Sequence, residues 1–133
     1  MRHILLRVQQ GLAWVVLVGL FLQFYLVGLA LFGVTSFEFH RALGYSLAVP
    51  IFLLLVLALG GGLGRRLVAL AALLVVLTIV QATLPSLRSS VPLVAALHPL
   101  NALALMGLSA AIVRQSRADA VARSSMVDVP GST

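Results

Sequence analysis

Two glutamine–histidine pairs stand out in a chain made mostly of Leu, Val and Ala. Gln23 precedes His40 by 17 residues. Gln81 precedes His98 by the same interval, 58 positions further along the chain. Neutral imidazoles bind haem iron and other metal ions, and they also relay protons. If the two histidines face each other, they can supply both axial ligands of one haem, so the spacing predicts a bis-histidine site.

The residues close to each histidine suit the same chemistry. A histidine that binds a metal normally donates its other ring N–H to a fixed acceptor, and Gln23, Gln81 and Asn101 are the candidates. Haem propionates need a cation near the water boundary, which Arg41 or Arg88 could provide.

Small residues follow each histidine by one helical turn. Gly44 shares a helix face with His40, and Ala102 shares one with His98. They would leave room for a flat, bulky group between the helices.

Other uses of the histidines stay open. Zinc would need a third protein ligand, for which Glu38 is the only convincing candidate. A proton relay or a quinone site could use the same side chains. The simplest alternative makes His40 an interfacial residue and His98 a hydrogen-bonded core residue, while His3 is a solvated terminal residue.

The elements that position these residues are membrane helices. Of the 133 residues, 62% are hydrophobic and only 9% are charged, whereas soluble domains carry about 25% charged residues. Apolar runs predict helices over about residues 8–33, 40–60, 66–84 and 91–114. They form a single domain over 1–115, followed by a flexible cytoplasmic tail over 116–133. The predicted fold is an all-α integral membrane four-helix bundle with antiparallel neighbours.

The arginines predict the orientation. Seven of the nine lie at one end of the predicted bundle, and only Arg41 and Arg88 lie at the other. The positive-inside rule then places both termini in the cytoplasm. The Arg-only composition, rich in Ala, Leu and Val, looks like that of a high-GC bacterium, so the expected location is a bacterial plasma membrane. Because the arginines are spread over helix ends, the net charge of +6 indicates topology and not a nucleic-acid surface.

The repeated Gln–His spacing also predicts an internal repeat of two helical hairpins. Both hairpins would run in the same direction, related by a pseudo-twofold axis along the membrane normal. Such an axis would bring His40 and His98 to the same depth on opposite sides of the bundle.

Three short motifs carry a resemblance to known families. The stretches "FHRALG" and "LHPLNA" resemble the starts of helices two and four in a family of small actinobacterial four-helix membrane proteins that has no established function. Together with "VQATL", they more weakly resemble one four-helix half of haem A synthase. In that family a His-Arg pair, matched here by His40 and Arg41, and a later His, matched by His98, belong to a haem site. Glu38 lies one position too close to His40 for the family's acidic motif, and a second bundle is lacking.

The expected function is therefore that of a membrane protein that binds haem b through His40 and His98 and serves in electron transfer or haem handling. One alternative is a non-catalytic membrane subunit or assembly factor without a cofactor. Another is a small transporter or quinone-binding protein. Expected partners are the lipid bilayer and either a second copy of the chain, forming a homodimer, or another membrane protein. The sequence leaves open whether the protein is an enzyme.

Overall fold

The computed structural model describes the backbone of residues 2–127 and the side chains of residues 3–122, and it contains no strand within that range. Four long helices carry the fold, with a 3-10 helix and one short helix between the third and the last. They are α1 (Arg2–Leu31), α2 (Phe37–Gly60), α3 (Arg65–Thr83), η1 (Leu84–Ser89), α4 (Pro92–Ala95) and α5 (His98–Val127).

The four long helices cross a membrane. The apolar spans measure 29, 24, 25 and 31 residues, with mean hydropathies of 1.6 to 2.6, so each exceeds the ~20 residues that a hydrocarbon core requires. Large apolar side chains such as Phe21, Phe52 and Ile79 point outward. Lipid accepts these side chains as readily as a protein core does, and the chain is thus an integral membrane four-helix bundle.

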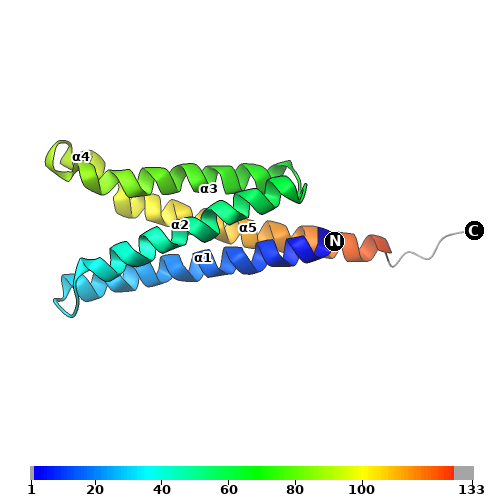
Figure 1. Cartoon of the computed structure of the whole chain (residues 1–133), viewed down its shortest axis with the longest axis horizontal. Helices are drawn as coiled ribbons and strands as arrows, with labels where there is room; N and C mark the ends of the chain where they lie inside the picture. The colour runs from blue at the N-terminus through cyan, green and yellow to red at the C-terminus, as the bar shows by residue number, and fades with distance from the viewer. Residues whose placement is uncertain (1, 128–133) are drawn as a thin grey trace, which may run out of the picture.

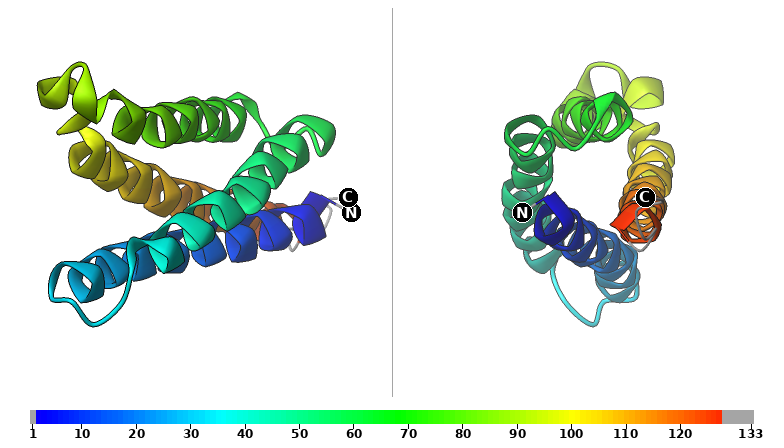
Figure 2. Two further views of the ribbon diagram at one scale, coloured as in Figure 1. Left: turned by 60° about the vertical axis from the view of Figure 1, so that its left-hand side comes forward. Right: turned by 90° about the vertical axis from the view of Figure 1, so that its right-hand side faces the viewer.

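The helices are arranged in a ring in the order α1, α2, α3, α5, and each packs against the next (Figure 1; Figure 2). Long helices that follow one another in the sequence are antiparallel (Figure 1). Short turns join α1 to α2 and α2 to α3, and η1 and α4 lie between α3 and α5. The start of α1 and the end of α5 consequently lie at one end of the bundle. The starts of α2 and α5, where His40 and His98 occur, lie at the other end.

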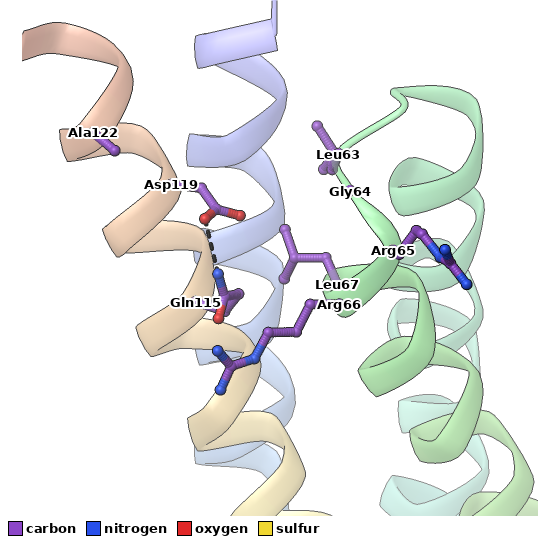
Figure 3. Close-up of a pocket in the computed structure, with 8 residues that line it drawn as sticks. All are labelled: Leu63, Gly64, Arg65, Arg66, Leu67, Gln115, Asp119 and Ala122. Atoms are coloured by element: carbon purple, nitrogen blue, oxygen red, sulfur yellow. Dashed lines mark hydrogen bonds between the residues drawn. The ribbon is translucent and has the colours of Figure 1, made fainter. Parts of the chain in front are cut away.

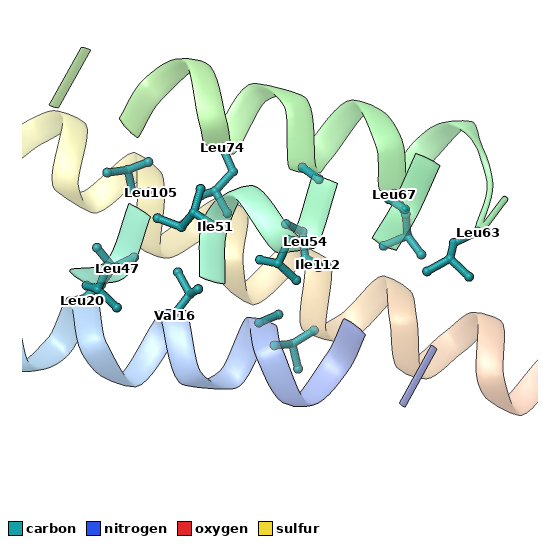
Figure 4. Packing of buried hydrophobic residues seen from close by; sticks show 14 of the residues in the cluster. Val16, Leu20, Leu47, Ile51, Leu54, Leu63, Leu67, Leu74, Leu105 and Ile112 are labelled. Atoms are coloured by element: carbon teal, nitrogen blue, oxygen red, sulfur yellow. The ribbon is translucent and has the colours of Figure 1, made fainter. Parts of the chain in front are cut away.

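The core repeats with the 58-residue offset of the two glutamine–histidine pairs. Seven buried positions of the first hairpin correspond to seven buried positions of the second, and several of them are labelled in Figure 4. Both hairpins therefore bury the same faces, as the predicted repeat requires. The pairs are Gln9/Leu67, Ala13/Ala71, Val16/Leu74, Leu47/Leu105, Ile51/Ser109, Leu54/Ile112 and Ala58/Ser116.

The turn between α1 and α2 fixes the position of His40. Helix α1 ends at Leu31, and Gly33, two residues later, takes a positive φ of 73°, which glycine adopts without strain. Ser36 then caps α2 by accepting a hydrogen bond from the Glu38 backbone N–H at 3.4 Å. The first turn of α2 thus includes His40, close to the water boundary.

The fourth predicted helix differs most from the structure. A continuous helix from residue 91 was expected, whereas α4 ends at Ala95 and α5 begins at His98. Both new starts have a proline in the first turn, Pro92 and Pro99, where a missing N–H costs nothing.

The outer limits of the bundle also differ. Helix α1 begins at Arg2, earlier than the expected residue 8, and α5 continues to Val127. The segment 116–127, expected to be a flexible tail, is therefore helical. The remainder of the predicted tail, residues 128–133, lies outside the described residues.

Candidate functional site

His40 and His98 meet at the end of the bundle where α2 and α5 begin. Their ring centroids are 6.2 Å apart, and the ring planes are inclined by 69° in an edge-on arrangement. Both side chains are partly buried. The two hairpins thus bring together side chains that are 58 residues apart in the sequence.

Each histidine is oriented by its partner glutamine's backbone. His40 Nδ1 lies 3.4 Å from the carbonyl oxygen of Gln23, and His98 Nδ1 lies 3.1 Å from that of Gln81. A carbonyl oxygen can only accept, so both Nδ1 atoms carry the proton. Each neutral ring then has its lone pair on Nε2, the atom that would bind a metal.

The environment of His98 is a closed hydrogen-bond network. Gln81 Nε2 lies 3.2 Å from His98 Nε2. Asn101 Nδ2 donates to Gln81 Oε1 at 2.7 Å and to the Leu77 carbonyl at 2.9 Å. This network fixes the Gln81 amide with its NH₂ group toward the imidazole.

The environment of His40 is more open, although it occupies the equivalent place. The Gln23 side chain is buried against α2, and its Oε1 has no hydrogen-bond partner in the structure. A Cβ atom on Gly44 would lie 3.0 Å from Gln23 Nε2. Glycine at position 44 therefore lets the amide approach the α2 backbone closely.

The apolar core stops below these residues. The last buried apolar side chains before the site are Leu20, Leu47, Leu74 and Leu105. Beyond them lie the two histidines and their amide partners, with Leu84 at the start of η1 as a further buried apolar residue. Polar groups are costly within a bilayer, so a cluster at one depth from all four long helices indicates a binding site or a structural network.

The charged residues near the site face the water boundary. Arg41 lies 4.0 Å from Glu38, and their side chains are 66% and 78% exposed. An exposed pair of this kind contributes little to stability. Arg88 is also exposed, on η1. Among the side chains of residues 3–122, no group of three His, Cys, Asp or Glu residues could hold an ion, so Glu38 does not form a three-residue metal site with the two histidines.

The separation of the rings fits a single metal ion between them. A metal–nitrogen bond of about 2 Å on each side, plus about 1 Å from each nitrogen to its ring centre, spans roughly 6 Å. The measured distance is 6.2 Å. Two neutral imidazoles are the donor set of bis-histidine haem proteins. The residues fit such a group, provided that the Gln81 amide moves off His98 Nε2.

Two buried polar residues escaped the sequence analysis. Gln9 and Ser116 are both fully buried. Gln9 Nε2 donates to the Leu54 carbonyl at 3.1 Å, while Gln9 Oε1 and Ser116 Oγ have no partner in the structure. The repeat could have identified them, since they lie 58 positions from the core residues Leu67 and Ala58 respectively.

A cavity of about 510 Å³ lies at the opposite end of the bundle, between the start of α3 and the last turns of α5. Figure 3 shows Arg66 extending toward α5, where Gln115 donates to Asp119 at 2.8 Å. This cavity contains none of the predicted site residues. It is open to the surroundings and separate from the two histidines.

Residues 23–87, just under half of the chain, match the model of a protein family of unknown function, DUF6220. The matched segment begins at Gln23 and includes α2 and α3, so it covers His40 and Gln81 but not His98. Neither a curated protein nor a solved structure matches the chain. The chain is therefore similar over this segment to a family whose members share a sequence pattern but no established activity.

Proposed function

We propose that this protein binds haem b through His40 and His98 and that it transfers electrons or handles haem in a bacterial plasma membrane. The observation that carries the proposal is the 6.2 Å separation of the two rings, each with its Nδ1 directed at a backbone carbonyl. The Nε2 atom of each ring then carries the lone pair that would bind iron, and at His98 this requires the Gln81 amide, 3.2 Å away, to move off it.

The chain's own residues would bind and orient the group. The Gln23 and Gln81 carbonyls hold the two imidazoles in the tautomer that ligates through Nε2, as acceptors for ligating histidines commonly do. Arg41, next to His40 at the water boundary, is placed to pair with a carboxylate. The weak resemblance to one half of haem A synthase, through His40, Arg41 and His98, supports the same assignment.

The chemistry that haem supplies when bound is one-electron transfer. With one imidazole on each side, no coordination position stays open, which disfavours oxygen chemistry. The surrounding apolar residues would exclude water from the site and lower the local dielectric constant.

The test is an absorption spectrum of the purified protein, oxidised and then reduced with dithionite. We expect a sharp α-band in the wild type, and its loss or a shift to a high-spin spectrum in His40→Ala and in His98→Ala. His3→Ala is the matched control, because His3 is exposed near the start of α1 and should not affect the band. A wild-type protein that stays colourless after haem is added would reject the proposal.

The orientation belongs to the same proposal. Arginine counting supports cytoplasmic termini, which would place the two histidines near the outer face of the membrane. An electron carrier at that depth needs a donor and an acceptor, and a second copy of the chain or another membrane protein is the expected partner.

A further inference from the structure

The two histidines occupy equivalent positions in the repeat, but their Nε2 atoms do not have equivalent surroundings. His98 Nε2 lies 3.2 Å from the Gln81 side chain amide. His40 Nε2 has no hydrogen-bond partner among the side chains that the structure describes. Both backbone carbonyls accept a hydrogen bond from Nδ1 of their histidine. The two Nε2 atoms therefore differ only in how the glutamine side chains lie.

The Gln81 amide can only donate to His98. His98 Nδ1 carries the proton because it lies 3.1 Å from a carbonyl oxygen, which leaves Nε2 as an acceptor. Asn101 Nδ2 donates to Gln81 Oε1 at 2.7 Å, so the Gln81 NH₂ group faces the ring. The lone pair that would bind a metal is thus occupied by a hydrogen bond.

Asn101 makes this arrangement stable. Its NH₂ group also donates to the Leu77 carbonyl on α3. This second bond holds the Asn101 side chain in place independently of the position of Gln81. Gln23 has no counterpart of Asn101, because Leu43 occupies the equivalent position in α2. The Gln23 amide is accordingly left with an unpaired, buried Oε1.

We infer that Gln81, held by Asn101, is a positioning residue that blocks His98, so that His40 is the first of the two histidines to accept a ligand. This inference rests on the proposed function, in that the ligand is a planar metal complex with two free axial positions. His98 completes the ligand set only when the Gln81 amide rotates away from Nε2. A single neutral hydrogen bond of this kind changes an equilibrium by roughly 2- to 12-fold.

Acylation by diethyl pyrocarbonate tests the inference without any haem, because the lone pair of a neutral imidazole attacks a carbonyl carbon of the reagent and forms an N-ethoxycarbonyl group, with release of ethanol and carbon dioxide. Peptide mass spectrometry of the detergent-solubilised full chain would give separate rates for His3, His40 and His98. We expect His40 to react several-fold faster than His98. In Gln81→Leu, which cannot donate, the His98 rate should rise several-fold while the His40 rate stays the same.

The repeat supplies the matched control. Gln23→Leu removes the equivalent amide, but that amide does not bond to His40, so both acylation rates should stay near the wild-type values. Asn101→Leu should raise the His98 rate, because the Gln81 amide loses its anchor. Equal rates at His40 and His98 in the wild type, or an unchanged His98 rate in Gln81→Leu, would overturn the inference.

A haem titration of the same variants separates this inference from the proposed function. Gln81→Leu should bind haem with several-fold higher apparent affinity than the wild type and with a larger low-spin fraction. If no variant binds haem but Gln81→Leu still exposes His98 to acylation, the blocking role stands and only the haem assignment fails. If haem binds equally well to both proteins, the blocking role fails.

Discussion

Gly44 lies one helical turn after His40, at the place where the Gln23 side chain meets α2. A Cβ there would lie 3.0 Å from Gln23 Nε2, which is closer than side chains normally pack. The second hairpin has Ala102 at the equivalent position. Both hairpins therefore carry a small residue one turn after the histidine, and in the first it lies against the Gln23 amide.

Enlarging Gly44 should therefore weaken the site. Gly44→Leu should displace the Gln23 amide toward His40, and because overpacking costs about 1–3 kcal/mol, haem affinity should fall by roughly tenfold. Gly44→Ala should stay close to wild type, since the end of a flexible side chain can move by a few tenths of an ångström. Haem titration followed at the Soret band measures both.

Gly28→Leu is the control for this change, because a Cβ at Gly28 meets no atom within 4 Å. It adds the same volume at a position with free space around it. Wild-type affinity in Gly44→Leu would mean that the position of the Gln23 amide does not matter to the ligand.

The sequence indicated which residues meet at this site, but it did not indicate which side chains form hydrogen bonds with each other. The equal spacing of Gln23–His40 and Gln81–His98 was enough to select both histidines and both glutamines. Which atom of each glutamine would contact the histidine depends on the neighbour across the helix pair, Asn101 in one half and Leu43 in the other. No sequence spacing encodes that difference without the hairpin geometry.

At the scale of helices, close packing of α1 against α2 depends on Gly19. A Cβ there would overlap the side chain of Leu47, which is itself buried. Association of membrane helices relies on such close contacts, because lipid provides no hydrophobic driving force between them.

Gly19→Ala should consequently destabilise the bundle, by about 1–3 kcal/mol if the overlap forces α1 and α2 apart. Gly28→Ala changes helix propensity by the same amount in the same helix but meets nothing. The difference between the two free energies of unfolding, measured by SDS titration, isolates the packing contribution. Leu47→Ala should cost less stability in the Gly19→Ala background than in the wild type, because it also removes the overlap. Identical stability of Gly19→Ala and Gly28→Ala would contradict the packing role.

Helix existence followed from hydropathy, but helix ends did not. Apolar runs long enough to span a bilayer identified α1, α2, α3 and α5. The break before His98 goes with Pro99 in the first turn of α5, whereas the apolar span runs across it from Pro92 to Ala122. The end of α5 carries the charged residues Arg117, Asp119 and Arg123, so it was expected to be a tail, although the helix continues to Val127.

At the scale of the whole molecule, the repeat is the feature that links the fold to the site. Seven buried positions recur with one offset, and the same offset relates the two histidines. A pseudo-twofold arrangement of two hairpins places one copy of any repeated residue on each side of the bundle axis. When both hairpins carry a histidine at the same position, the two histidines therefore face each other across the bundle.

Because the two hairpins run in the same direction, their turns must lie on the same side of the membrane. The chain contains no cysteine, so single-cysteine variants can report this without background. Val34→Cys and Ser89→Cys place exposed thiols at the two turns, and Gly60→Cys places one at the opposite end of α2.

With cytoplasmic termini, a membrane-impermeant maleimide should label positions 34 and 89 in intact cells and position 60 only after permeabilisation. The reverse pattern would keep the repeat but invert the proposed orientation, moving the histidines to the cytoplasmic face. Labelling of positions 34 and 89 from opposite sides would contradict the two-hairpin topology itself, and with it the reason why His40 and His98 meet.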